Sequence, residues 1–263
     1  MRRFAVIGNP VEHSLSPIIH SAGFAALGIS ANYTAVQVTE DDFRKWWNSE
    51  AAKFDGFSVT MPLKALAYEV ADELDHAARN IGVANTMVKR NNRWIGSNTD
   101  WLGYSRPLNA VDGLRAKRVL ILGAGGAARA AVYAALHSEP LEVLVYNRTV
   151  SRLQKLRQDF PGINVITEID DTEDIDTIIN TTSVGMAELV NETPIDVKFL
   201  NPDQLVFESI YKPPETVLVQ QAKHIGASTI SGYELLLAQA YEQFRIFTGR
   251  DAPQQVMREA IGQ

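Results

Sequence analysis

The sequence predicts an α/β protein of two domains, an N-terminal α/β domain and a second, doubly wound domain of Rossmann type. Short apolar runs alternate with helical periodicity in the first part of the chain, which is typical of βα units around a mostly parallel sheet. The second half opens with an apolar run at 118–122, a glycine-rich turn, an alanine-rich helix to about residue 137 and a second apolar run at 141–146. That order is a βαβ unit of the usual length.

The remaining elements of the first half follow from the same periodicities. Gly28 ends the first helix, and Asn91-Asn92 predict a hairpin turn between two strand-like segments. The expected strands are 4–7, 33–38, 57–60, 85–89 and 94–97, and the expected helices are 17–27, 41–53 and 63 to about 80.

In the second half, further strands are expected at 175–179 and 205–207, and a long amphipathic helix at Gly232–Thr248. Pro107 and Gly113 interrupt the pattern, and we expect the domain boundary near them. The expected division is 1–103 with 232–263 for the first domain and 104–231 for the second, the last helix folding back onto the first domain.

Composition excludes several classes of protein. The formal charge of −6 argues against binding to nucleic acid, and no apolar stretch approaches the roughly 20 residues that span a bilayer. The charged start resembles that of a signal peptide, but its apolar run ends at Gly8-Asn9-Pro10, which favours a buried first strand. The chain has no cysteine and its histidines lack metal-ligand spacing, so we expect no metal site and a cytoplasmic location.

The glycine-rich turn predicts a dinucleotide site. Gly123, Gly125 and Ala128 fit the G-x-G-x-x-G/A fingerprint between a strand and a helix. The first glycine permits the tight turn, the second lets backbone approach a pyrophosphate, and the small third residue lets helix and strand pack closely. Amides at the start of the helix then face the anion.

The residues after the next strand favour NADP over NAD. An NAD site usually has Asp or Glu there to accept hydrogen bonds from the ribose, but this chain has Asn147-Arg148-Thr149 and then Arg152. A guanidinium binds a 2′-phosphate bidentately. The alternative is that both arginines are solvated residues of a helix start, although cations there oppose the helix dipole.

Candidate substrate residues lie in the first half. Ser16 is expected to cap the first helix, with Pro17 in its first turn, and Ser14 would point to the same side of an extended segment. Lys64 lies just beyond the end of a strand, where open α/β sheets bind ligands. Asp100 begins a helix. Each of these residues also has an ordinary structural explanation as a cap or a surface residue.

Together and in this order, these segments resemble the shikimate dehydrogenase family over essentially the whole chain. The motifs that carry the resemblance are Gly8-Asn9-Pro10 with His13-Ser14-Leu15-Ser16-Pro17, Val59-Thr60-Met61-Pro62-Leu63-Lys64, Asn85-Thr86, Asn98-Thr99-Asp100, Gly123-Ala124-Gly125-Gly126-Ala127, Asn147 to Arg152, Asn180 to Met186, and Gly232 with Gln239-Ala240.

The resemblance implies an NADP-dependent enzyme that interconverts shikimate and 3-dehydroshikimate, on the route to chorismate and aromatic amino acids. It implies that Lys64 and Asp100 are the catalytic pair. The substrate-binding residues that it implies are Ser14, Ser16, Thr60, Asn85, Tyr211 and Gln239. The cofactor-binding residues that it implies are Gly123, Ala124, Gly125, Gly126, Ala127, Asn147, Arg148, Thr149, Arg152, Ser209 and Gly232.

Three positions depart from the family's usual residues: Ser58 stands in place of Asn, Glu208 in place of Asp, and Leu235 in place of Met. Quinate-using relatives share the scaffold, so an enzyme for quinate or for both acids stays open. A catalytically silent module that senses NADP would need neither Lys64 nor Asp100, so both residues count against it. We expect a monomer or a homodimer.

The chemistry leaves the role of Lys64 open. Oxidising a secondary alcohol requires hydride transfer to the nicotinamide and removal of the hydroxyl proton. A free lysine is a poor base at neutral pH, and a neighbouring Asp100 would favour its charged form. Lys64 is therefore a candidate base, a candidate proton donor for ketone reduction, or an electrostatic stabiliser of the alkoxide.

Overall fold

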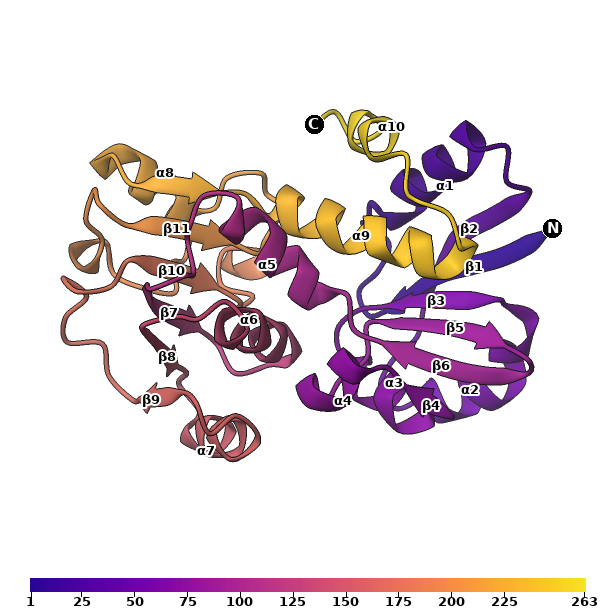
Figure 1. Cartoon of the computed structure of the whole chain (residues 1–263), viewed down its shortest axis with the longest axis horizontal. Coiled ribbons are helices and arrows are strands. Elements are labelled where there is room, and N and C mark those ends of the chain that lie inside the picture. Colours follow the sequence, from indigo (N-terminus) through magenta and orange to yellow (C-terminus); the bar gives the residue numbers. More distant parts are fainter. The chain divides into compact units, whose positions relative to one another are not determined.

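The computed structural model describes all 263 residues and separates into two compact units. Unit 1 consists of Met1–Thr99 and Gln239–Gln263, and unit 2 of Asp100–Ala238. The sequence-based division placed the two boundaries at 103/104 and 231/232, and the compact units meet at 99/100 and 238/239. Figure 1 shows one sheet with its covering helices in each unit.

Unit 1 is a mixed six-stranded sheet in the order β2-β1-β3-β5-β6-β4. β1 pairs in parallel with β2 and β3, whereas β3, β5 and β6 form antiparallel pairs. Its elements are β1 (Arg2–Gly8), α1 (Ser16–Ala26), β2 (Ala31–Gln37), α2 (Phe43–Glu50), the short helix η1 (Ala51–Lys53), β3 (Gly56–Val59), α3 (Lys64–Val70), β4 (Glu73–Leu74), α4 (His76–Ile81), β5 (Thr86–Arg90), β6 (Arg93–Ser97) and α10 (Gln254–Glu259).

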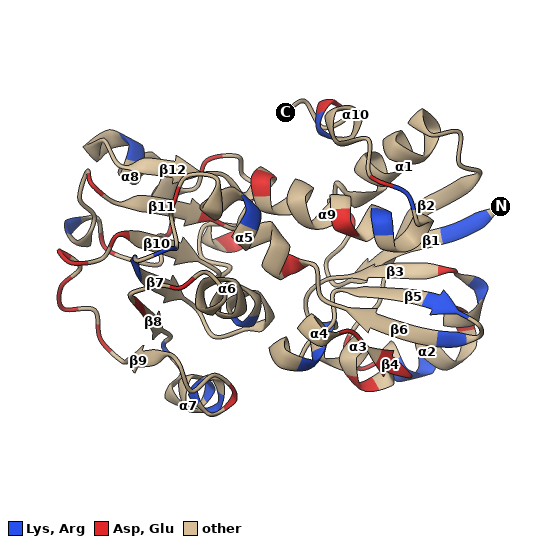
Figure 2. Cartoon of the chain, in the orientation of Figure 1, with Lys and Arg blue, Asp and Glu red and all other residues tan.

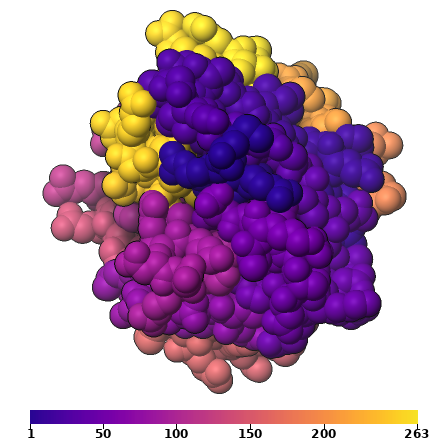
Figure 3. Space-filling view, turned by 90° about the vertical axis from the view of Figure 1, so that its right-hand side faces the viewer, coloured from indigo at the N-terminus to yellow at the C-terminus, as the bar shows by residue number.

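Both ends of the chain contribute to the core of unit 1. Phe4 of β1 stacks on Phe247 with ring centroids 4.8 Å apart, and Phe24 of α1 lies 5.4 Å from Phe244. All four rings are buried, so the C-terminal segment completes the hydrophobic core that the N-terminal strand begins. Figure 3 shows the N-terminal segment beside the C-terminal one on the face of this unit.

The hairpin expected at Asn91-Asn92 is confirmed. β5 and β6 are antiparallel neighbours, and the two asparagines have φ values of 49° and 61°. Positive φ at both central residues is what a type I′ turn requires, and asparagine adopts it more readily than most residues.

The single helix expected from 63 to about 80 is wrong. α3 ends at Val70, and a short strand and a separate helix, α4, follow. Asp72 accepts from the backbone N–H of Trp94 at 2.6 Å and its own N–H donates to the Trp94 carbonyl, while Asp75 caps α4 by accepting from Ala78 N at 2.6 Å. Pairing with β6 and a new N-cap therefore override helical periodicity here.

Unit 2 is a six-stranded sheet in the order β12-β11-β10-β7-β8-β9, with every neighbouring pair parallel. This confirms the doubly wound, Rossmann-like domain. Its elements are α5 (Asp100–Asn109), β7 (Arg118–Leu122), α6 (Gly126–Leu136), β8 (Glu142–Tyr146), α7 (Val150–Asp159), β9 (Asn164–Ile166), β10 (Thr177–Asn180), η2 (Ala187–Leu189), η3 (Val197–Phe199), β11 (Leu205–Glu208), α8 (Val217–Ile225), β12 (Ser228–Ile230) and α9 (Gly232–Thr248), which ends in unit 1.

Pro107 was expected to break the helical pattern near the domain boundary, but it lies inside α5. A proline in a helix removes the bond from its own nitrogen to the carbonyl four residues earlier, here that of Gly103. Pro107 stands in the last turn of α5, so the helix loses one bond and ends at Asn109.

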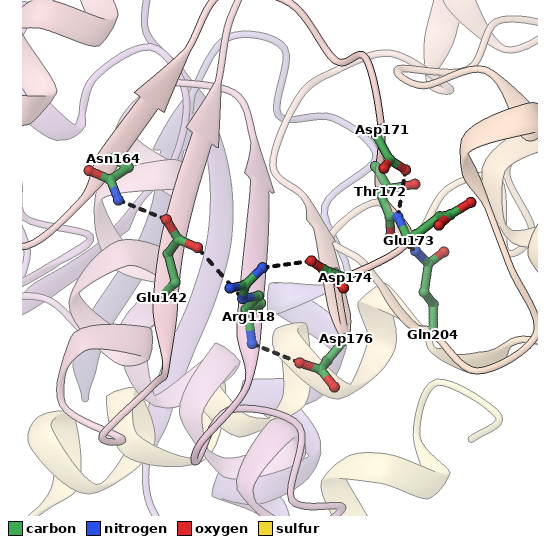
Figure 4. Close-up of polar contacts among 9 residues, drawn as sticks. All are labelled: Arg118, Glu142, Asn164, Asp171, Thr172, Glu173, Asp174, Asp176 and Gln204. Atoms are coloured by element: carbon green, nitrogen blue, oxygen red, sulfur yellow. Dashed lines mark hydrogen bonds and ion pairs between the residues drawn. The ribbon is translucent and has the colours of Figure 1, made fainter.

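The loop between β9 and β10 carries many of the acidic residues of unit 2 (Figure 2). Arg118, at the start of β7, ties this loop to the sheet: its Nη1 donates to Asp174 at 3.0 Å, and its backbone N–H donates to Asp176 at 2.8 Å. Glu142, at the start of β8, lies 3.8 Å from Arg118 and accepts from Asn164 (Figure 4). These contacts lie at the amino ends of the strands, the edge opposite to the one where such sheets bind ligands.

No helix of the chain combines the length and the apolar character needed to span a membrane.

Candidate active site

The strand order of unit 2 reverses at β7. From β7 the chain proceeds to β8 and β9 on one side, and then to β10, β11 and β12 on the other. Ligands of doubly wound sheets bind beyond the carboxyl ends of the strands at such a reversal. The predicted cofactor residues follow β7, β8 and β11 or begin α9, so they gather at this edge.

The glycine-rich turn after β7 has the conformation that its sequence predicts. Gly123 has a φ of +115°, and a Cβ there would lie 2.5 Å from Thr181 Oγ1, so only glycine fits. Gly125 is the N-cap of α6 and has no side chain to bond the first amides, while a Cβ on it would meet no atom within 4 Å. Open space therefore lies beside the unbonded amides that begin α6, as an anion site requires.

The end of β8 carries uncompensated positive charge. Arg148 and Arg152 are exposed, neither guanidinium group forms a hydrogen bond or an ion pair, and the first turn of α7 contains no acidic residue. Asn147 Nδ2 donates to the Thr149 carbonyl at 3.2 Å, which holds the turn that presents Arg148. Arg129 in the same unit, by contrast, pairs with Asp159 at 2.7 Å.

Ser209 and Gly232 are the other predicted cofactor residues of this edge. Ser209 follows β11, and its hydroxyl donates to the Asn180 carbonyl and receives a hydrogen bond from Tyr104 at 2.9 Å. Gly232 begins α9, and any Cβ on it would collide with the Ile210 carbonyl. Tyr211 is half-buried, with its ring centroid 6.1 Å from that of Tyr233.

The predicted cap of α1 is corrected by the structure. Ser16 is the first residue of the helix rather than its cap, and it is Ser14 whose Oγ accepts from the Ser16 backbone N–H at 3.3 Å. Ser14 N donates to the Val11 carbonyl, so the segment before the helix is a turn and not extended. The turn forms because the Ser14 hydroxyl supplies the acceptor that the first amides of the helix lack.

Thr60 and Lys64 lie where β3 leads into α3. Thr60 N donates to the Ile7 carbonyl at 2.9 Å, and a Cβ on Gly8 would collide with the Thr60 side chain, so β1 and this turn pack closely. Lys64 is the first residue of α3, and its carbonyl accepts from Ala84 N at 3.0 Å. Both side chains are half-buried, which suits contact with a ligand.

The side chain of Asn85 is held in one orientation by Thr99 and Thr86. Its Oδ1 accepts from Thr99 N at 2.7 Å and from Thr86 Oγ1 at 2.8 Å, and its Nδ2 donates to Thr99 Oγ1 at 2.9 Å. The amide carbonyl of this buried side chain is thereby engaged within the protein.

A buried chain of hydrogen bonds runs from Tyr33 of β2 to Asn85, and we call it the Gln243 network. Tyr33 donates to Ser58 Oγ at 2.5 Å, Ser58 donates to Gln243 Oε1 at 2.6 Å, and Gln243 Nε2 donates to Thr86 Oγ1 at 3.0 Å. Every donor has an acceptor, and all protons point the same way along the chain.

Burial raises the pKa of the Tyr33 phenol, so Tyr33 stays a donor at neutral pH.

Asp100 is the first residue of α5 and is almost fully buried, with 6% of its surface exposed. Its charge, together with burial as the larger effect, raises the pKa of Tyr104 one turn further along the helix. Asp100 is the next residue after Thr99, whose backbone N–H donates to Asn85 Oδ1. Of the proposed catalytic pair, Lys64 belongs to unit 1 and Asp100 to unit 2.

Sequence reasoning missed Gln243, Tyr33 and Glu208 as residues that support the site. Gln243 could have been noticed, because it lies four residues after Gln239 and therefore on the same face of α9. Both glutamines are buried, with 7% and 2% of their surfaces exposed.

The chain matches three protein families that together cover most of its length. Residues 6–87 match the shikimate dehydrogenase substrate binding domain, residues 108–198 match shikimate/quinate 5-dehydrogenase, and residues 232–261 match the shikimate 5′-dehydrogenase C-terminal domain.

Among curated relatives, the shikimate dehydrogenase (NADP(+)) of Syntrophobacter fumaroxidans is 36% identical, over 98% of this chain and 92% of the relative. That of Staphylococcus aureus is also 36% identical, over 98% and 97%. Among solved structures, the shikimate dehydrogenase of Aquifex aeolicus has a TM-score of 0.92 at 33% identity, covering 100% of this chain and 98% of that one. The Thermus thermophilus shikimate 5-dehydrogenase in complex with NADP(H) and shikimate has a TM-score of 0.91 at 31% identity, covering 99% and 98%.

Proposed function

Since the chain belongs to the shikimate dehydrogenase family, we propose that it is an NADP-dependent shikimate dehydrogenase. It interconverts shikimate and 3-dehydroshikimate on the route to chorismate and aromatic amino acids. The observation that carries the cofactor assignment is the unpaired arginine pair, Arg148 and Arg152, after β8. Two free guanidinium groups at that position suit a 2′-phosphate, whereas an NAD site would have a carboxylate there.

The cofactor would be held by backbone and arginine. Gly123, Gly125 and the amides that begin α6 suit its pyrophosphate, and Arg148 and Arg152 suit its 2′-phosphate. When bound, the nicotinamide supplies the acceptor or donor of the hydride. Nothing else in the reaction requires a cofactor, since the remaining step is the movement of one proton.

Two side chains of the protein would manage that proton and the charge that develops on the oxygen. In oxidation, the carbinol C–H leaves as hydride, the O–H loses its proton, and a ketone remains. We assign Lys64 to that oxygen, as the group that takes the proton in oxidation and returns it in reduction. We assign Asp100 as its carboxylate partner, which holds the ammonium and the hydroxyl in place.

Substrate recognition would use hydroxyl and amide side chains. Ser14, in the turn before α1, and Ser16, the first residue of α1, suit the carboxylate of shikimate. Asn85 would contact a ring hydroxyl, with its side chain held in place by Thr99 and Thr86. The other proposed contacts to the ring hydroxyls are Thr60, Tyr211 and Gln239.

The test is steady-state turnover of shikimate and quinate with NADP and NAD, in four combinations on one purified sample. We expect kcat/KM to be highest for shikimate with NADP. Higher kcat/KM for quinate would make the protein a quinate dehydrogenase, and absence of turnover with measurable NADP binding would make it a cofactor-sensing module. The cytoplasmic location, the monomeric or homodimeric state and the lack of a nucleic-acid partner stay predictions.

A further inference from the structure

Glu208 is a buried carboxylate without a cation. It ends β11, and only 1% of its surface is exposed. No lysine or arginine pairs with it, although buried carboxylates usually have such a partner. Burial raises its pKa, and hydrogen bonds from its neighbours oppose that shift.

Hydrogen-bond donors surround Glu208 instead. Asn180 Nδ2 lies 3.0 Å and 3.1 Å from its two oxygens, Ile210 N donates to Oε1 at 2.9 Å, and Thr216 Oγ1 donates to Oε2 at 2.8 Å. Each of these partners is a donor, so the site requires an acceptor at both oxygens. A carboxylate meets that requirement, and an amide of the same shape does not.

These bonds join two loops. Asn180 precedes the loop 181–186, and its Oδ1 accepts from Thr182 N at 3.0 Å and from Thr182 Oγ1 at 2.8 Å. Ile210 and Thr216 belong to the loop 209–216 after β11. We call this set of bonds the Glu208 network. Glu208 accepts hydrogen bonds from the side chain of Asn180 and from two residues of the second loop. The conformations of both loops are therefore held by one carboxylate.

The network extends to α5. Ser209 donates to the Asn180 carbonyl, and Tyr104 of α5 donates to Ser209 at 2.9 Å. The Tyr104 ring packs 5.3 Å from the buried ring of Phe207. Tyr104 lies one turn after Asp100, so the same network also steadies the helix that carries the proposed catalytic carboxylate.

The sheet order indicates which half of a dinucleotide these loops would meet. The glycine turn follows β7 and Arg148 follows β8, so the pyrophosphate and the adenosine 2′-phosphate belong to that side. The other half of the cofactor then extends over β10, β11 and β12. The loops joined by Glu208 follow β10 and β11.

We propose that Glu208 is a positioning residue that holds loops 181–186 and 209–216 in the form that binds the nicotinamide half of NADP. The inference rests on the proposed function, because it takes NADP as the cofactor. Glu208 acts through Asn180 and Ser209 and contacts neither substrate nor the reacting atoms in this role.

The test compares Glu208→Gln and Glu208→Asp with the unaltered protein. Glutamine brings an N–H against one of the donors, whereas aspartate keeps two acceptor oxygens on a shorter side chain. Equilibrium dissociation constants are measured for NADP and for adenosine 2′,5′-bisphosphate, which lacks the nicotinamide half. The KM for shikimate is measured at saturating NADP.

We expect Glu208→Gln to raise the Kd for NADP about tenfold, the loss that about 1.4 kcal/mol represents. The Kd for the bisphosphate and the KM for shikimate should each change less than about twofold, and Glu208→Asp should restore most of the NADP affinity. The matched control is Glu142→Gln, a strand carboxylate of the same unit at the opposite edge (Figure 4). It should leave both nucleotide affinities unchanged.

The outcomes separate this inference from the proposed function. An unaltered protein that neither binds NADP nor oxidises shikimate refutes the proposed function. An active unaltered protein whose Glu208→Gln variant binds NADP normally, or loses NADP and bisphosphate equally, overturns the positioning role. If Glu208→Gln does not fold, the Kd of Thr216→Val for NADP is measured instead, because this variant removes one donor to the carboxylate. An NADP Kd unchanged by Thr216→Val then overturns the proposal.

Discussion

Replacing Gln243 by leucine tests whether the Gln243 network fixes Asn85 for its proposed contact with substrate. The change keeps a side chain of similar size on α9 and removes one acceptor and two donors from a residue that is 2% exposed. Ser58 then keeps a buried O–H without an acceptor. The Asn85 carbonyl still accepts from Val59 N at 2.6 Å, and Thr86 still donates to Asn85, so only one group is left unsatisfied.

The expected cost follows from that count. An unsatisfied buried donor costs about 1 to 3 kcal/mol, and each lost neutral hydrogen bond about 1 kcal/mol. Gln243 Nε2 makes two such bonds, to Thr86 Oγ1 at 3.0 Å and to the Asn85 carbonyl at 3.3 Å. We expect the free energy of unfolding of unit 1 to fall by about 3 to 5 kcal/mol, and the KM for shikimate to rise because Asn85 loses support.

A double variant makes the prediction sharper. Ser58→Ala alone removes the Ser58 hydroxyl that accepts from Tyr33 and leaves Gln243 Oε1 without a donor. Combined with Gln243→Leu, it leaves neither an unsatisfied Ser58 hydroxyl nor an unsatisfied Gln243 oxygen. The double variant should therefore be more stable than the sum of the two single losses predicts, by about 1 to 2 kcal/mol.

Urea unfolding followed by tryptophan fluorescence measures these differences. Trp46, Trp47 and Trp94 lie in unit 1 and only Trp101 in unit 2, so the signal reports mainly on unit 1. The transition of unit 1 is fitted separately, because two units need not unfold together. Gln255→Leu is the control: this glutamine is exposed, and its replacement should change stability by less than about 0.5 kcal/mol.

Two results would refute the reasoning. A loss below about 1 kcal/mol for Gln243→Leu would mean that the network contributes little to stability. Strict additivity of Ser58→Ala and Gln243→Leu would mean that Tyr33, Ser58 and Gln243 do not act as one chain of bonds.

Three further predictions concern the chemistry, the cofactor and pH. Lys64→Ala should lower kcat at least about 100-fold while the Kd for NADP changes less than about twofold; near-normal turnover in a stopped-flow assay contradicts the assignment. Arg148→Ala should raise the KM for NADP about tenfold and leave that for NAD almost unchanged, and equal losses contradict a role in reading the 2′-phosphate. Burial lowers the pKa of His20 to about 3, below its unfolded value of 6.5, so its contribution to stability is complete above pH 6.5 and is lost as pH falls toward 3. His20→Phe should flatten urea-unfolding stability across that range by up to about 1.4 kcal/mol per pH unit, and an unchanged slope contradicts it.

Local sequence signals predicted β7 and α9 well. The run 118–122 is β7, and Gly232–Thr248 is α9. Parallel strands buried on both faces read as continuous apolar runs, and a glycine-rich turn between strand and helix has a fixed geometry. The end of α3 within the segment 63–80 could not be predicted from local sequence, because it depends on hydrogen bonds between Asp72 and Trp94 of another strand.

In the candidate site, too, some residues can be predicted from local sequence and others cannot. Gly123 is readable from sequence, because its positive φ and its close approach to Thr181 restrict the position to glycine. Glu208 and Gln243 are not, because their partners come from other elements: Gln243 meets Ser58 across 185 positions of the chain. No sequence pattern around a glutamate at the end of a strand predicts that three donor groups surround it.

Stability alone gives no reason for the two buried networks. Replacing a fully satisfied polar cluster by apolar side chains of similar volume is often neutral or stabilising, so a core needs neither Glu208 nor Gln243 in order to fold. What polar bonds add is direction, because each fixes the orientation of the next group. The Gln243 network ends at Asn85, and the Glu208 network ends at Ser209 and Tyr104. If both networks exist to orient ligand-binding groups, apolar replacement of a whole network should preserve folding and lower affinity for the ligand on its own side alone, shikimate for one and NADP for the other.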